Sequence, residues 1–192
     1  MDDFVIWGST YSEGSCVIEK PEGLKEPYLL TDGIELSDQW PEGVVCRMND
    51  EFPKDIRLTD NLYGANSPVI SQHLKERISV LAPASQIEFL PVTILNHKGR
   101  VASKDYFFLN PIGTVDCIDI EKSRVVWNAM NKTVISSVKQ LTLSNGTVPE
   151  KVGILRPAYL TRTIFLRRSL SERLSQDGFT GLMFREFAKF RG

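Results

Sequence analysis

The 192-residue sequence predicts an α+β fold with a mainly antiparallel sheet, one long and one shorter helix, and an irregular β-rich N-terminal part. Three observations predict it. The first 60 residues hold short apolar runs broken by glycine and proline, an amphipathic segment follows at residues 68–81, and aromatic strand-like runs come directly after it.

Strand-sized runs in the N-terminal part occur at residues 4–7, 16–18, 28–30 and 44–46. The polar segment 50–66 is the best candidate for a boundary, but no Gly/Ser-rich or Pro-rich linker separates the two sides. We therefore expect a single domain over residues 1–192. Within it, residues 1–60 form an acidic β-rich subdomain and residues 67–187 form an α+β core.

The long helix is predicted over residues 68–81. Ser67 before Pro68 matches a helix start, because the hydroxyl can accept a free backbone N–H and proline needs no N–H there. Apolar side chains then recur at a helical spacing, at Ile70, Leu74, Ile78 and Leu81. One face of the helix is expected to be buried.

Residues 86–95 and 106–109 are predicted as an antiparallel pair joined by a turn at residues 96–99. Pro91 favours an edge or a bulge in the first strand, since proline cannot donate to the ladder. The aromatic second strand is expected in the centre of a core.

Further elements are predicted beyond residue 123. Strands or short extended segments are expected at residues 125–127, 138–143, 156–160, 164–166 and 181–187. The shorter helix is predicted from Ser169, with Glu172 at capping-box spacing and Gly178 as a left-handed stop.

Charge divides the chain. Residues 1–60 contain 14 Asp and Glu against 5 Lys and Arg, a net charge of −9, whereas the remainder contains 10 against 18, a net charge of +8. The two parts either neutralise each other internally or leave an acidic face for a basic partner.

Compartment follows from what the sequence contains. No apolar run reaches the length of a bilayer, and the N-terminus has no secretory signal pattern. Cys16, Cys46 and Cys117 are widely spaced and odd in number, as expected for buried thiols in a reducing compartment. We expect a cytoplasmic protein without a membrane partner.

Common catalytic motifs are missing, and only His73 and His97 can serve as bases near neutral pH. A cysteine-dependent enzyme would have to use Cys117 with His97 and Asp116. Asp116 and Asp119 without a third ligand fit a solvated turn better than a cation site. We therefore expect no catalytic residue, no metal site and no cofactor.

A nucleic-acid-binding module is a rival interpretation that rests on the basic C-terminal residues, with Arg167 and Arg168 at a helix start as phosphate ligands. The whole set is Arg156, Arg162, Arg167, Arg168, Arg173, Arg185, Lys189 and Arg191. The isoelectric point near 6.2 and the apolar residues between the arginines weigh against it, so nucleic acid is an unlikely partner on this pattern.

Trp40 lies among the carboxylates of Glu35, Asp38 and Glu42. An aromatic bordered by charges is typical of a core anchor and of an interface hot spot alike. Base rates favour the core anchor, and both interpretations stay open.

Five stretches resemble the successive blocks of one bacterial family, the Imm-eleven family of immunity proteins found beside polymorphic toxin genes. They are residues 67–78, 87–92, 106–110, 115–123 and 169–184. The resemblance covers roughly residues 67–184 and leaves the acidic first part outside. It carries over no catalytic residue.

The resemblance implies a non-catalytic role: binding a cognate toxin encoded nearby, often an effector of a type VI or related secretion system, and holding it inactive. The sequence leaves open whether the chain also forms a homo-oligomer. Glu35, Asp38, Trp40 and Glu42 are the hypothesised toxin-binding residues, since an acidic segment with an aromatic anchor suits a basic toxin.

Overall fold

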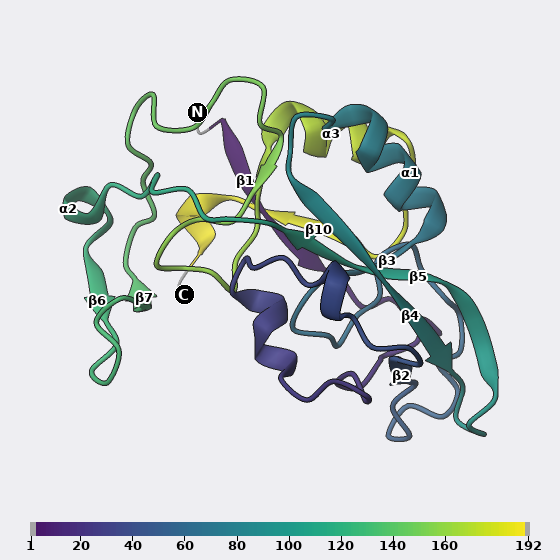
Figure 1. Ribbon diagram of the computed structural model, residues 1–192. Coiled ribbons are helices and arrows are strands. Elements are labelled where there is room, and N and C mark those ends of the chain that lie inside the picture. The colour runs from purple at the N-terminus through teal and green to yellow at the C-terminus, as the bar shows by residue number, and fades with distance from the viewer. Residues whose placement is uncertain (1–2, 191–192) are drawn as a thin grey trace.

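The structure is a computed structural model that describes residues 3–190, and it has the expected α+β class (Figure 1). The strands are β1 (Phe4–Ser9), β2 (Val45–Arg47), β3 (Val69–Ser71), β4 (Ile87–Leu95), β5 (Val101–Pro111), β6 (Val125–Trp127), β7 (Ile135–Val138), β8 (Ile154–Leu155), β9 (Phe165–Arg167) and β10 (Leu182–Arg185). The α-helices are α1 (Gln72–Leu81), α2 (Ile120–Ser123) and α3 (Arg168–Gln176). Short 3-10 helices are η1 (Pro27–Thr31), η2 (Ser37–Gln39) and η3 (Phe187–Lys189).

The strands form two four-stranded sheets, in the orders β10-β1-β9-β8 and β2-β4-β5-β3, and the separate β6–β7 hairpin. All pairings between these strands are antiparallel except that of β2 with β4. Each four-stranded sheet contains a strand from the first 60 residues, since β1 lies between β9 and β10 and β2 lies beside β4. The division of the chain near residue 60 remains a prediction.

The first sheet is buried on both faces at β1. Phe4 and Ile6 belong to one core cluster and Val5 and Trp7 to another, because side chains alternate along a strand. An uninterrupted apolar run is the sequence signature of such a strand. The strand expected at residues 4–7 is therefore confirmed.

The second sheet is built on the β4–β5 hairpin. The expected antiparallel pairing is present, and its turn is held by Asn96, whose Oδ1 accepts the backbone N–H groups of Lys98 and Arg100. Pro91 lies in β4 just before the residues that pair with β2, so it faces no strand on that side. β5 is central, with Phe108 and Leu109 buried.

The long helix begins four residues later than predicted. Residues 69–71 form β3 instead, paired with residues 106–108 of β5, and α1 starts at Gln72. The N-cap is Ser71, whose Oγ accepts the N–H of Leu74 at 3.2 Å. The hydroxyl of Ser67 donates to the carbonyl of Leu30 instead.

Four short segments also differ from expectation. Residues 28–30 belong to η1, which begins at Pro27, and within residues 16–18 only Val17 and Ile18 make isolated bridges. Residues 156–160 are not an extended segment, because residues 158–159 form a turn and Tyr159 has a left-handed φ of 65°. A strand was expected at residues 138–143, but β7 covers Ile135–Val138 and shares only Val138 with that range.

The shorter helix, α3, begins at Arg168 with no side-chain cap, so the capping box of Ser169 and Glu172 is wrong. Arg167 ends β9 immediately before it, and the strand leads directly into the helix. The helix still stops before Gly178, which has a left-handed φ of 79°, and β10 follows as expected.

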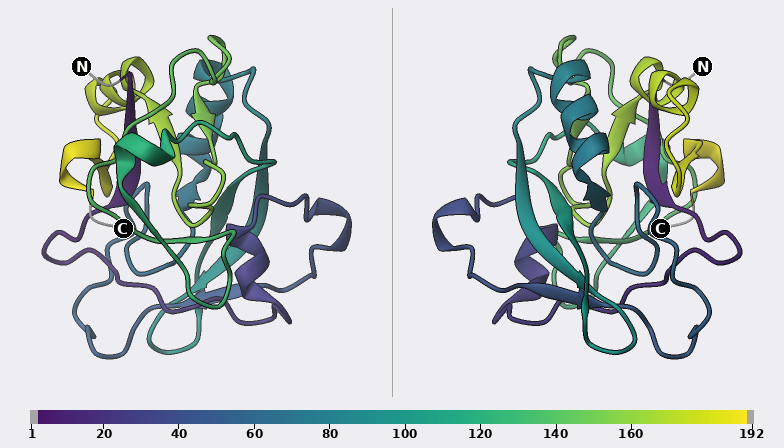
Figure 2. Two further views of the ribbon diagram at one scale, coloured as in Figure 1. Left: turned by 90° about the vertical axis from the view of Figure 1, so that its left-hand side faces the viewer. Right: turned by 90° about the vertical axis from the view of Figure 1, so that its right-hand side faces the viewer.

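Within residues 3–190, none of the helices combines the length and apolar character that a bilayer crossing requires. Figure 2 shows that η2 projects from the side of the body, well away from the sheet that contains β1. This projection carries the predicted binding residues.

Candidate functional site

The four predicted residues lie on the connection between η1 and β2, in and around η2. Glu35, Asp38 and Glu42 are exposed, and no hydrogen bond or ion pair of their side chains occurs within the described part of the chain. We call Glu35, Asp38, Trp40 and Glu42 the acidic surface. Its carboxylates are free to meet a partner.

Trp40 makes the contacts of a core residue, and its role at an interface stays a prediction. Its ring packs edge-on against Phe108, with centroids 5.9 Å apart, and its Nε1–H donates to the carbonyl of Pro91 at 2.9 Å. It is nevertheless only partly buried. The core contacts fix the indole, and its outer part remains at the surface.

Hollows lie on both sides of Trp40. One, of about 370 Å³, is lined by residues of the segment 23–41, including Leu24 and Leu29. The other, of about 400 Å³, lies between Glu42 and the β4 residues Pro91 and Thr93. Recesses of this size beside a fixed aromatic ring can accept side chains of a partner protein.

A buried carboxylate holds the backbone that enters η2. Glu88 on β4 is 7% exposed, and it accepts the N–H groups of Leu36 and Ser37 at 2.7–3.0 Å as well as the Ser37 hydroxyl. Asn110 donates from Nδ2 to Glu88 and to the carbonyl of Ile34, both at 2.9 Å. Burial by itself raises the pKa of Glu88, but these hydrogen bonds together hold the pKa below its ordinary value.

Arg156 holds the backbone at Leu30 and Thr31, before the residues that Glu88 binds. It is 2% exposed, and its guanidinium donates to the carbonyls of Leu30, Thr31, Pro111 and Thr161 and to Oδ1 of Asn110. Burial lowers the pKa of Arg156 to about 10, although Asp32 opposes the shift. The guanidinium makes five hydrogen bonds in all, and none of them goes to a carboxylate. We call Glu88, Asn110 and Arg156 the polar network.

Gly33 is required where the segment passes this network. Its φ is +74°, and a Cβ there would lie 2.8 Å from the carbonyl oxygen of Gly113 and 3.0 Å from Cδ of Arg156. The backbone carbonyl of Gly33 accepts the N–H of Gly113 at 2.6 Å. Only glycine combines this conformation with so close an approach.

Within residues 3–190, few oppositely charged side chains of the two parts are in direct contact. The one such contact among the described residues joins His97 and Asp50, with Nδ1 and Oδ1 3.2 Å apart, and it is an ion pair only when the imidazole is protonated. The arginine pairs Arg77–Asp177 and Arg168–Glu186 lie within the basic part. Direct pairing therefore leaves most of the acidic charge exposed to solvent.

A family model described as Immunity protein family (Imm11) matches residues 10–189. The chain belongs to the Imm11 immunity protein family. No protein with a curated description matches it. The match extends over the acidic first part, which the resemblance had left outside, so the Imm11 region includes the acidic surface.

The rival thiol chemistry finds no support in this Imm11 chain. Cys117 is 0% exposed, and burial together with the charge of Asp116 raises its pKa to about 12. A nucleophilic thiol needs exposure and a lowered pKa. Asp119 caps α2 and binds Lys122 at 2.7 Å. Within residues 3–190 no group of three His, Cys, Asp or Glu is placed to hold a metal ion.

The basic C-terminal residues of the Imm11 chain do not form one patch. Arg156 is buried in the polar network, Arg167 donates to the carbonyls of Pro149 and Val152, and Arg168 pairs with Glu186. Arg191 lies outside the described residues. The phosphate site that the rival nucleic-acid interpretation places at Arg167 and Arg168 is therefore occupied by protein contacts.

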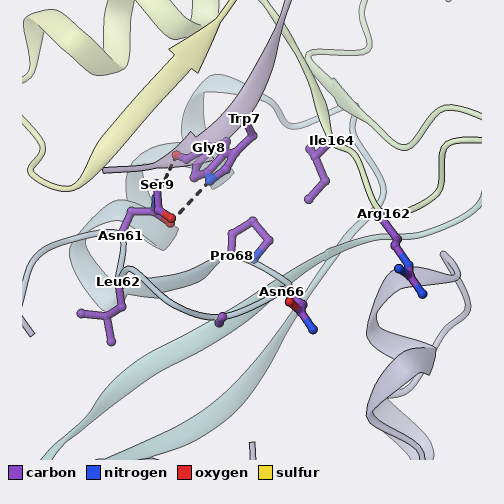
Figure 3. A pocket seen from close by; sticks show the side chains of 10 residues that line it. Trp7, Gly8, Ser9, Asn61, Leu62, Asn66, Pro68, Arg162 and Ile164 are labelled. Atoms are coloured by element: carbon purple, nitrogen blue, oxygen red, sulfur yellow. Dashed lines mark hydrogen bonds between the residues drawn. The ribbon is translucent and has the colours of Figure 1, made fainter. Parts of the chain in front are cut away.

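Arg162 is exposed and lines a small hollow of about 100 Å³ between β1 and residues 61–68 (Figure 3). In this hollow Asn61 accepts from Nε1 of Trp7 at 3.4 Å and donates to the carbonyls of Gly8 and Gly181 at 3.1 Å. These contacts join β1 to its neighbours, so the polar groups of the hollow serve the fold.

Proposed function

We propose that this Imm11 protein binds a toxin encoded beside its own gene and holds it inactive without catalysing a reaction. Family membership over residues 10–189 is the observation that carries the proposal. The toxin would be an effector of a type VI or related secretion system, met in the cytoplasm of the producing cell or its siblings.

The acidic surface is proposed as the toxin contact. Glu35, Asp38 and Glu42 are exposed, and their side chains have no partner among residues 3–190. Trp40 is fixed by Phe108 and Pro91. A rigid aromatic side chain beside free carboxylates can supply a central anchor and attract a basic toxin region. A stable complex needs about 800 Å² from each partner, so the contact extends beyond these four residues.

The test is co-expression with the product of the adjacent gene, followed by pull-down and by rescue of growth in cells that produce it. Stable co-purification and restored growth are expected for the wild-type protein. If both proteins are expressed and folded but neither co-purify nor restore growth, the immunity role is contradicted. Light scattering of the purified chain alone, at the same concentration, determines whether it also forms a homo-oligomer.

The acidic surface is tested by a charge-only variant, Glu35→Gln with Asp38→Asn and Glu42→Gln, which leaves the anchoring of Trp40 intact. Its association rate should fall about tenfold at low salt and less at high salt, because steering is screened. The matched control is Glu51→Gln with Asp105→Asn and Glu172→Gln, at exposed carboxylates outside both proposed contacts. Equal effects of both variants would remove the acidic surface from the interface.

A further inference from the structure

The β6–β7 hairpin exposes a second apolar cluster, chemically unlike the acidic surface. Val126 is 50% exposed, Trp127 37%, Val134 37% and Met130 98%. Figure 1 shows the hairpin projecting from the body on the side of α2, away from the two larger sheets. Apolar side chains gathered on a projection are typical of an interaction site. We call these four residues the hairpin tip.

The loop that presents Met130 is folded by its own side chains. Oδ1 of Asn128 accepts the N–H groups of Met130 and Asn131 at 2.9 Å. Oδ1 of Asn131 accepts the N–H and the hydroxyl of Thr133 at 3.0 and 2.7 Å. Binding through a loop that is already ordered loses less conformational entropy than binding through a flexible one.

The inner side of the hairpin is fixed to the body. Ile135 and Val138 are buried, and the N–H of Ile135 donates to the carbonyl of Tyr159 at 2.8 Å. Trp127 packs edge-on against Tyr159, with ring centroids 5.4 Å apart. A two-stranded hairpin is marginal by itself, so these contacts keep it in place. The outer side, with Met130, packs against none of the other described residues in this way.

Charge indicates what the tip can meet. Residues 122–149 contain Lys122, Arg124, Lys132 and Lys139 and no Asp or Glu. Lys122 is paired with Asp119. The other three cations have no ion pair within residues 3–190. A complementary surface therefore offers an apolar recess bordered by carboxylates.

The hairpin and the acidic surface are held by one segment of the chain. Tyr159 supports Trp127, and Arg156, three residues earlier, binds the carbonyls of Leu30 and Thr31 in η1. A partner that contacts both regions would therefore meet a pre-ordered arrangement. The hairpin tip is too small to supply a standard interface alone, which favours insertion into a recess as part of a larger contact.

We propose that the β6–β7 hairpin inserts Met130 into an apolar recess of the toxin that carboxylates border, as the second contact of the complex. The inference rests on the proposed function. It assigns the acidic surface and the hairpin tip to different, oppositely charged regions of the same toxin.

The decisive variant is Met130→Asp, measured for affinity to the purified product of the adjacent gene by titration calorimetry. The side chain has almost no contact within the folded chain, so the melting temperature should not change. Affinity should fall at least tenfold, because a carboxylate enters an apolar recess edged by like charge. The matched control is Val80→Asp, at a 70% exposed apolar residue on α1, and it should bind as the wild type does.

Charge is tested separately with Lys132→Glu and Lys139→Glu together, against Lys98→Glu and Lys151→Glu as a control pair with the same change in net charge. The first pair should slow association about fivefold at low salt, and the control pair should not. Equal effects of the two pairs would contradict a local acidic border.

The outcomes separate the two proposals. If the wild-type chain forms no complex with the toxin, both the proposed function and this inference are wrong. A wild-type complex that Met130→Asp leaves unchanged removes only the hairpin contact. The hairpin contact with the toxin is also wrong if Met130→Asp keeps toxin binding but loses binding to a 20-base-pair DNA duplex or to phosphatidylserine vesicles. The tip would then bind nucleic acid or a lipid surface.

Discussion

The acidic surface and the hairpin tip each present one large apolar side chain, Trp40 and Met130, on differently supported backbones. Trp40 stands among free carboxylates on a segment held by buried polar groups from distant parts of the chain, with Arg156 reaching Thr31 across 125 sequence positions. Met130 stands on a loop held by Asn128 and Asn131, whose side chains accept backbone N–H groups two or three positions further along the chain. The first region therefore depends on the whole fold for its shape, and the second depends mainly on its own sequence.

The largest loss of stability is expected from Arg156→Met, which removes the guanidinium group and leaves the buried carbonyls that it binds without donors. The free energy of unfolding should fall by about 2–4 kcal/mol, measured by urea denaturation, since several buried acceptors lose their partners. Toxin binding through the acidic surface should weaken as well. The control is Arg162→Met, at an exposed arginine of the same segment that has no hydrogen bond or ion pair within residues 3–190, and it should change neither quantity.

A smaller loss is expected from Glu88→Gln, which keeps the shape of the side chain. One carboxylate oxygen becomes an NH₂ group that faces the donors of Leu36 and Ser37, so unfolding should become easier by about 2 kcal/mol. Glu35→Gln is the same change at an exposed side chain without a partner in the described part of the chain, and it should leave the urea midpoint unaltered. Similar midpoints for the two variants would show that the polar network does not hold η2.

The same glutamate should make stability depend on pH. Its pKa is lower in the folded chain than the ordinary 4.5, so its stabilising contribution is complete above about pH 4.5 and is lost as pH falls through the folded value. The difference in unfolding free energy between wild type and Glu88→Gln should shrink between pH 5 and pH 3. Other carboxyls with a lowered pKa, such as Asp60 and Glu186, remain in both proteins and cancel in this comparison.

The smallest effect on stability is expected from Asn128→Ala with Asn131→Ala in the hairpin. The loop loses its side-chain acceptors, but Ile135 and Val138 still anchor the strands, so the free energy of unfolding should fall by less than about 1 kcal/mol. Amide exchange at Met130 and Thr133 should accelerate, and toxin affinity should drop a few-fold. The control is Asn145→Ala, in the exposed turn after residue 144. If the double variant Asn128→Ala with Asn131→Ala lost as much stability as Arg156→Met, the loop would not be held mainly by its own side chains.

Local chemistry made the main elements predictable. The apolar run at β1, the Asn-containing turn between β4 and β5, and Gly178 after α3 follow from side-chain alternation and from left-handed backbone. The start of α1 was not predictable in this way. Ser67-Pro68 and Ser71 are both chemically sound starts, and the pairing of residues 69–71 with β5 decides between them.

The candidate site divides along the same line. The exposure of Glu35, Asp38 and Glu42 agrees with their charge, and Trp40 was recognisable as an aromatic among carboxylates. The hairpin tip was missed, although Met130 in a stretch free of acidic residues was a signal that could have indicated it. The polar network was also missed, because Glu88, Asn110 and Arg156 are ordinary polar residues until the chain brings them together.

The sequence by itself determined the fold class, the family, the charge division and the buried stripe of each main element, because these depend on periodicity and composition within short stretches. The tertiary structure alone decided where strand gives way to helix at Ser71, that Arg156 and Glu88 are buried with full hydrogen bonding, and that the acidic carboxylates stay unpaired. Those outcomes rest on contacts between residues far apart in the chain, whose burial and partners no local pattern specifies.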